Sequence, residues 1–257
     1  MFNWFFSGLY KYRVVLGQLV RQQITMRYRR TVFGFFWTLL NPLLNMVVIA
    51  TVFSIVMKFQ IHDYAIFLFS AVIPWGFFSN AISQSASSLI ANESIFKKIY
   101  LPKQIFVTAN LISGLIDSLL STICLFVIAI FFGAELSLAL FFLPISFFLL
   151  FMFSYGLGLI LSIISVFLRD VQYLIGVILQ ALYFMTPIIY PISSVPERYQ
   201  WVFTWNPMFY FVDIFREPIY NSALPHLESI QYCVFFATIT FVCGVAFFNM
   251  NDKKIMF

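Results

Sequence analysis

The sequence predicts an all-α polytopic membrane protein. We expect six transmembrane helices, an N-terminal interfacial amphipathic helix, and short re-entrant outer helices before the last span. Hydrophobic residues make up 62% of the 257 positions and charged residues only 10%, whereas soluble domains carry about 25% charged residues. Several apolar stretches also reach the roughly 20 residues that a helix needs to cross a bilayer. We interpret residues 1–257 as a single transmembrane domain.

The first predicted element is an amphipathic helix over residues 13–31, in which apolar residues recur about every four positions. Its basic residues, with no acid among them, are Arg13, Arg21, Arg27, Arg29 and Arg30. Two interpretations stay open. The helix either contacts a cytosolic partner or only anchors the chain with positive charge on the inner side. The first span follows over residues 32–57, with a kink expected at Pro42.

Five further stretches are predicted to span the membrane, at residues 64–90, 105–133, 138–167, 171–190 and 229–249. The second and third of the six spans carry polar residues at helical spacing, which lipid would penalise. An antiparallel hairpin of these two spans brings Asn80 and Asp117 to similar depth. We therefore predict that Asp117 is hydrogen-bonded near Asn80 or Gln84. Adhesion between helices and a charge-dependent role in transport are both open interpretations of this polar set.

Two short connections are predicted on the inner side. Residues 92–100 include the sequence ESIFKKI, which predicts a short amphipathic helix with Asn92 as its N-cap. Arg169 and Asp170 form almost the whole connection before the fifth span. The carboxylate of Asp170 is placed to cap the helix that follows and to meet its positive dipole end.

The outer side carries the longest irregular stretch, residues 193–228. Its apolar pieces are too short to cross a bilayer, so we predict short outer helices that act as a gate. Pro187 and Pro191 interrupt the outer end of the fifth span. With this topology, twelve lysines and arginines lie on the inner side and three on the outer side. The positive-inside rule then places both termini in the cytosol.

Motifs for chemistry are missing from the sequence. It holds no glycine-rich phosphate loop, no HExxH and no paired-cysteine metal pattern. His62 and His226 are isolated, and the three cysteines fall inside apolar runs, as small buried hydrophobes do. The basic residues flank spans and do not form a nucleic-acid-binding stripe. We expect a protein that moves or holds something, is not an enzyme, contains no metal or cofactor of its own, and takes its energy from elsewhere.

Three segments carry a family likeness: RYRRTVFGFFWTLLNPLL at 27–44, IPWGFFSNAI at 73–82 with the NESIFKKIYLPKQI turn at 92–105, and FLRDVQYLIGVILQALYFMTPIIYP at 167–191. With them, the chain resembles the membrane (permease) subunit of bacterial ABC-2 type polysaccharide exporters, which export O-antigen, capsule or teichoic acid. The likeness covers nearly the whole chain. It implies a multi-pass protein of the bacterial cytoplasmic (inner) membrane.

The resemblance implies a homodimer of this chain with two copies of a separate nucleotide-binding ATPase subunit, which would hold the ATP and Mg. Residues 92–100 would be the coupling helix seated in that subunit, with the connection before the fifth span close by. The implied contact residues are Asn92, Glu93, Ser94, Phe96, Lys97, Lys98, Arg169 and Asp170. No nucleic acid is implied as a partner.

The resemblance also implies a lipid-linked glycan as substrate, entering from the cytosolic leaflet. The translocation path between the two copies would include Trp37, Tyr183 and Phe184. The phosphate or gate residues would be Arg27, Tyr28, Arg29 and Arg30, unless the arginines serve topology alone. O-antigen is the favoured glycan. The alternatives are a permease for capsule, teichoic acid, a drug or a lipid, and, in another class, a non-transporting membrane scaffold or a lipid-modifying enzyme.

Overall fold

The structure is a computed structural model that describes residues 2–28, 61–131 and 137–255, together with isolated positions between 37 and 52. These ranges form helices and connections, without strands. The α-helices are α1 (Phe2–Lys11), α2 (Arg13–Tyr28), α4 (Ile61–Ala91), α5 (Glu93–Phe96), α6 (Gln104–Phe131), α7 (Leu143–Phe167), α8 (Val171–Phe184), α9 (Glu197–Thr204), α10 (Pro207–Tyr220) and α11 (Leu227–Asn251). Short 3-10 turns are η2 (Leu138–Phe142), η3 (Ile192–Ser194) and η4 (Asp252–Lys254).

Within the described ranges, four helices are long and apolar enough to cross a membrane. They are Tyr64–Ala91, Gln104–Cys124, Leu138–Phe167 and Leu227–Asn251, at the positions predicted for the second, third, fourth and sixth spans. The predicted first span, residues 32–57, lies outside the described residues apart from isolated helical positions. The predicted total of six spans therefore stays a prediction.

The prediction of a fifth span over residues 171–190 is wrong in its length. The helix α8 ends at Phe184 and is a shorter apolar helix of 14 residues. Pro187 explains the early end, because it has no backbone N–H to donate and disfavours the helical conformation at the residue before it. The predicted coupling helix over residues 92–100 is likewise shorter, since α5 covers only Glu93–Phe96. A segment this short is a poor helix by itself.

The N-terminal region holds two helices where one was predicted. The helix α1 precedes α2 and contacts α6 and α11, and α2 then packs along α6. The predicted interfacial helix over residues 13–31 corresponds to α2, which is described as far as Tyr28. The predicted short helices of the outer stretch are present as η3, α9 and α10.

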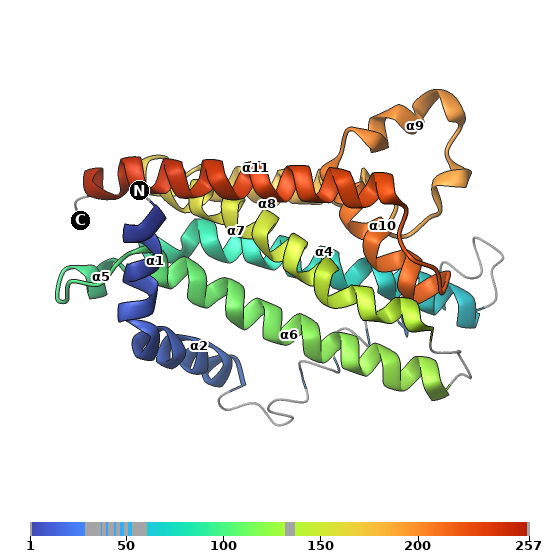
Figure 1. Cartoon of the computed structure of the whole chain (residues 1–257), viewed down its shortest axis with the longest axis horizontal. Coiled ribbons are helices and arrows are strands. Elements are labelled where there is room, and N and C mark those ends of the chain that lie inside the picture. Colours follow the sequence, from blue (N-terminus) through green and yellow to red (C-terminus); the bar gives the residue numbers. More distant parts are fainter. Residues whose placement is uncertain are drawn as a thin grey trace.

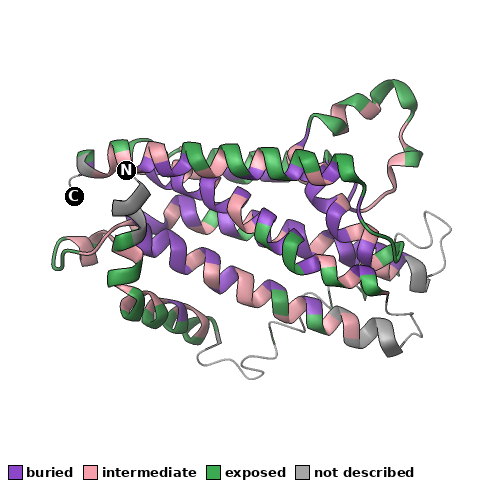
Figure 2. Ribbon diagram, viewed as in Figure 1, coloured by how far each residue is buried: buried purple, intermediate pink, exposed green. Residues whose placement is uncertain are grey.

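The long helices α4, α6, α7 and α11 lie side by side along the long axis of the molecule (Figure 1). Both termini and α5 lie at one end, and α9 and α10 lie at the opposite end (Figure 1). We call these the α5 end and the α10 end. Buried residues concentrate where α4 and α7 meet their neighbours, whereas α2 and the outer face of α11 are largely exposed (Figure 2).

Aromatic side chains fill much of the core between α4, α7 and α10. Phe153 stacks on Phe211 at 4.7 Å, and Phe147 meets Phe215 edge-on at 4.8 Å between ring centroids. Offset and edge-on pairs of this kind add to the stabilisation from burial. These ring contacts hold α10 against α7.

Candidate functional site

A polar junction joins α2 to the hairpin of α4 and α6. The guanidinium of Arg27 forms an ion pair with the carboxylate of Asp117 on α6. Its Nη2 atom also donates to Oε1 of Gln84 on α4 at 3.1 Å and to Oγ of Ser113 at 3.4 Å. One side chain of α2 therefore contacts both helices of the hairpin. We call this set, with Gln23 and Asn110, the polar junction.

The second half of the junction lies one helical turn earlier on α2. The side chain of Gln23 donates to Oδ1 of Asn110 and accepts from Oγ of Ser113 at 2.8 Å. Asn110 in turn donates to the backbone oxygen of Gln84 at 3.0 Å. Gln23 and Arg27 are four residues apart, and residues at this spacing share one face of a helix. The polar face predicted on the third span therefore meets a matching face on α2.

The prediction for Asp117 is refined by this geometry. Asp117 and Gln84 are neighbours, as predicted, because both contact the same guanidinium. The direct partner of Asp117 is Arg27, whereas Asn80 is exposed to the surroundings. Sequence reasoning assigned Arg27 to topology or phosphate and missed this pair. The four-residue spacing of Gln23 and Arg27 was the available signal.

Arg27 remains 31% exposed and Asp117 20% exposed. An ion pair is expensive to desolvate, and additional hydrogen bonds around it offset part of that cost. Gln84 and Ser113 supply such bonds to the guanidinium. The other residues of the predicted phosphate or gate set are the side chain of Tyr28 and the residues Arg29 and Arg30, which lie outside the described part of the chain.

The predicted ATPase-contact residues gather at the α5 end. Lys97 donates to Glu93 at 2.7 Å, and this hydrogen bond, with the charges of Lys97 and Arg169, lowers the pKa of the Glu93 carboxyl. The effect of Arg169 on Glu93 indicates that the two predicted inner connections lie close together. Ser94, Lys98, Arg169 and Asp170 are exposed. Asn92 and Phe96 are partly buried.

Neither predicted helix cap forms as expected. Asn92 occupies the N-cap position of α5, but its side chain donates to the backbone oxygen of Ser88 at 2.7 Å and does not cap α5. Asp170 precedes α8 without a capping bond from its side chain. Both N-cap residues have backbone conformations other than the extended one that favours capping. Asp170 is therefore left with its carboxylate exposed on the surface.

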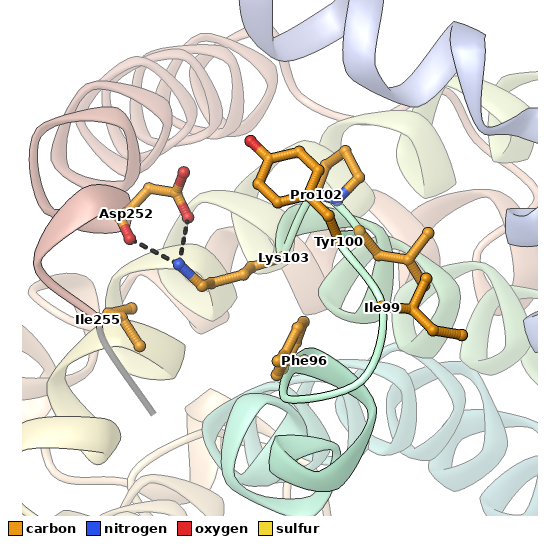
Figure 3. A pocket seen from close by; sticks show the side chains of 8 residues that line it. Phe96, Ile99, Tyr100, Pro102, Lys103, Asp252 and Ile255 are labelled. Carbon is orange, nitrogen blue, oxygen red and sulfur yellow. Dashed lines mark hydrogen bonds and ion pairs between the residues drawn. The ribbon is translucent and has the colours of Figure 1, made fainter.

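A pocket of about 190 Å³ opens at the same end, between the residues that follow α5 and the C-terminal turn (Figure 3). Lys103 donates to the backbone oxygen of Asp252 at 2.7 Å and to its carboxylate at 3.2 Å. Beside this link, Tyr100 is 84% exposed and Ile99 is 58% exposed. Exposed apolar side chains flanked by lysines are suited to contact another protein. Sequence reasoning did not identify this pocket, because its two walls are about 150 residues apart.

The predicted path residues lie elsewhere. The ring of Tyr183 meets Trp75 edge-on at 5.6 Å, and Phe184 meets Tyr183 at 5.5 Å. Phe184 is 56% exposed, and Trp37 is 39% exposed. Most residues around Trp37 lie outside the described ranges. The structure therefore groups Tyr183 with Phe184 and leaves their relation to Trp37 undefined.

Side chains that could bind a metal do not cluster in the described ranges: no three histidine, cysteine, aspartate or glutamate residues come together there. What the described site can do chemically is hold helices together by charge and hydrogen bonds and offer a mixed basic and apolar surface at the α5 end.

Comparison with known proteins gives a consistent result. A family model described as ABC-2 type transporter matches residues 15–220. The O-antigen export system permease protein RfbA of Klebsiella pneumoniae is 30% identical over 238 residues, which is 91% of each chain. The protein of the same name from Myxococcus xanthus is 29% identical over 87% of this chain and 86% of its own. The polysialic acid transport protein KpsM of Escherichia coli is 25% identical over 97% of this chain and 98% of its own.

Proposed function

Because this chain belongs to the ABC-2 type transporter family, we propose that it is the permease subunit of an ATP-driven exporter that carries a lipid-linked polysaccharide out of the cytosol. The observation that supports this most is coverage, since the polysaccharide permeases named above align with 87% to 97% of this chain. O-antigen is the favoured glycan, because the O-antigen permeases are 29–30% identical and the polysialic acid transport protein is 25% identical. Capsule export is the second candidate.

In this proposal the chain forms a homodimer and binds two copies of a nucleotide-binding ATPase subunit, which hydrolyses ATP with Mg. The α5 end faces the cytosol, so both termini are cytosolic. The ATPase subunit contacts α5 and the connection at Arg169 and Asp170. The exposed, mixed apolar and basic character of this end supports the assignment, because Tyr100, Ile99 and Lys98 all lie on the surface there.

The glycan passes between the two copies, along a path that includes Trp37, Tyr183 and Phe184. Aromatic faces suit sugars, whose C–H faces stack on them. The exposed position of Phe184 supports this part of the proposal. Arg29 and Arg30 are proposed to receive the pyrophosphate end of the substrate. Arg27 is given a structural role, because its guanidinium is already engaged by Asp117.

Deleting the gene in its native host tests the export function. We expect loss of the surface polysaccharide and accumulation of the lipid-linked glycan on the inner leaflet, with both restored by the gene in trans. The polymer that disappears separates O-antigen from capsule. Unchanged surface polysaccharide in the deletion strain would rule out the proposal.

Purification of the chain from native membranes should also retain an ATP-binding subunit, and an active chain without one would favour a lipid-modifying enzyme.

A charge reversal tests the contact with the ATPase subunit. Lys98→Glu changes an exposed cation beside α5, and Arg198→Glu changes an exposed cation on α9 at the other end as a matched control. We expect Lys98→Glu alone to reduce the amount of ATPase subunit that co-purifies. Equal recovery with both variants would argue against an interface at α5.

The phosphate role is tested separately from the ion pair. Arg29→Gln with Arg30→Gln leaves Arg27 and the polar junction unchanged, and an added lysine upstream in α1 preserves the inner-side charge. Reduced export with normal assembly is the expected result. Normal export in this variant would leave the two arginines with a role in topology alone.

A further inference from the structure

The segment between α8 and the outer turn η3 has an unusual backbone. Residues 185–190 are not helical, yet Thr186 and Ile188 are 0% exposed. A buried backbone outside a helix leaves carbonyl oxygens without their regular partners, and in a membrane protein each unpaired group is costly. The six carbonyls from Phe184 to Ile189 therefore need to be accounted for one by one.

Each of these six carbonyls accepts a hydrogen bond. The oxygen of Phe184 accepts from the hydroxyl of Tyr190, and that of Thr186 accepts from the backbone N–H of Ile188. The remaining bonds come from other helices. Asn206 donates to the oxygen of Met185 at 3.3 Å, Arg216 to those of Pro187 at 2.7 Å and Ile188 at 3.4 Å, and Tyr64 to that of Ile189 at 2.7 Å.

Arg216 is the one charged donor in this set. Its guanidinium lies over the ring of Phe67 on α4, with its carbon 3.9 Å from the ring centroid. Burial lowers the pKa of Arg216 to about 10, opposed by the nearby carboxylate of Asp213, so the side chain stays protonated at neutral pH. Asp213 is itself held by Ser229 of α11 at 2.6 Å. The cation therefore connects α10 and α4 to the backbone that follows α8.

This arrangement differs from an ordinary helix end. Carbonyls at a helix C-terminus carry partial negative charge, and a cation placed there forms hydrogen bonds stronger than neutral ones. A pocket of about 190 Å³ also lies beside the segment, lined in part by Phe67, Pro187, Pro191, Arg216 and Tyr220. Protein interiors are otherwise close-packed. The segment therefore borders unfilled space at Pro187 and Pro191.

We propose that Arg216 is a positioning residue for the outer end of the export path. It clamps residues 185–190 by their carbonyls and so holds α8, with Tyr183 and Phe184, in the resting position. Export requires this clamp to loosen so that the segment moves into the adjacent pocket. The inference rests on the proposed export function for its role in transport, but the clamp itself is a property of this chain alone.

The test measures access to Ile188, which is 0% exposed. Ile188→Cys is introduced into a chain whose Cys124, Cys233 and Cys243 are replaced by alanine, and a membrane-impermeant thiol reagent is added from outside the cell. Into this background go Arg216→Met, the conservative Arg216→Lys, and Arg198→Met. Arg198 is the matched control, because its guanidinium lies over Tyr199 at 4.5 Å on the same outer connection.

We expect Arg216→Met to raise the labelling rate of the thiol introduced by Ile188→Cys about tenfold, the change that corresponds to losing one charge-assisted hydrogen bond. Arg216→Lys should fall between Arg216→Met and the parent, and Arg198→Met should match the parent. Arg216→Met should also lower the melting temperature in detergent, because the carbonyls of Pro187 and Ile188 lose their donor. Labelling is therefore measured well below the melting temperature of every variant. A purely structural role would lower the melting temperature and leave the labelling rate under those conditions unchanged. Equal labelling in Arg216→Met and Arg198→Met would overturn the proposal.

Tyr64→Phe keeps the test decisive if Arg216→Met does not accumulate in the membrane. It removes only the hydroxyl that donates to Ile189 and leaves Arg216 in place. Faster labelling in both Tyr64→Phe and Arg216→Lys supports the clamp, and labelling of Arg216→Lys at the parent rate overturns it. Labelling needs neither glycan nor ATPase subunit, and a failure of the proposed export function would therefore leave this result intact. Export is scored in parallel, where faster labelling with an unchanged export rate would overturn the link between the clamp and transport.

Discussion

Two helix contacts in this molecule form by opposite means. Where α7 meets α11, the backbones approach so closely that a Cβ atom added at Gly156 would overlap the backbone oxygen of Thr240. Where α2 meets α4 and α6, polar side chains make the contact, led by Arg27 and Asp117. One contact depends on the absence of side chains and the other on their charge.

The difference between the two contacts follows from the lipid that surrounds the helices. In a bilayer the hydrophobic effect does not drive helices together, since lipid tails are as apolar as leucine side chains. Close packing through small residues and hydrogen bonds between helices remain available. At the α7–α11 contact the glycines are reciprocal, because a Cβ added at Gly244 would overlap the backbone oxygen of Gly156. The polar junction is joined instead by hydrogen bonds and an ion pair between side chains.

The largest effect is expected from adding one methyl group to the packed contact. Gly156→Ala places a carbon closer than 3.0 Å to three backbone atoms of Thr240 and Phe241, and backbone cannot move aside as a flexible side chain can. We expect a loss of about 3 kcal/mol or more. Thermal unfolding of the purified protein in detergent measures it. Gly176→Ala on α8 is the matched control, because nothing lies within 4 Å of its added carbon.

The polar junction should tolerate substitution better, and in a pattern that reveals its chemistry. Asp117→Leu leaves the Arg27 guanidinium without its carboxylate and should cost about 2 kcal/mol, moderated by the partial exposure of both groups. Asp117→Asn should be milder, because its amide oxygen still accepts from Arg27. The double variant Arg27→Met with Asp117→Leu should recover most of the loss, since no charge is left unpaired. Thermal unfolding and trypsin cleavage of α2 report both effects; additive losses in the double variant would contradict the pairing.

The two contacts also differ in how far the sequence predicts them. The polar face of α6 is visible as helical spacing in the sequence, and so is its need for a partner. Arg27 was harder to assign, because it lies 90 residues away and the positive-inside rule already explained it. No contact between Gly156 and Gly244 was predicted. Local sequence does not identify which distant helix crosses at Gly156, so their packing role was missed.

The local sequence also predicts the ends of the helices poorly. Pro187 is evident in the sequence, but the apolar residues around it led to a predicted span as far as residue 190, six residues beyond the end of α8. At α5 a helix was predicted over residues 92–100, but a single turn with no capping bond from Asn92 does not extend to residue 100. Composition and charge predict the fold class and the long helices. The points at which helices end depend also on hydrogen-bond donors from other helices, such as Arg216, which pair with the carbonyls beyond the helix end.

The smallest effect is expected from removing a hydrogen bond inside the packed region. Tyr155 is buried beside Gly156, and its hydroxyl pairs with that of Thr108 on α6 at 2.7 Å. Tyr155→Phe should cost about 1 kcal/mol, because Thr108 keeps its bond to the backbone oxygen of Gln104 and the ring still fills its space. The measurement is thermal unfolding of Tyr155→Phe in the same detergent as Gly156→Ala and Asp117→Leu. A loss in Tyr155→Phe as large as that in Gly156→Ala would mean that the packing of α7 depends on polar bonds as much as on close backbone approach, and the contrast between the two contacts would not hold.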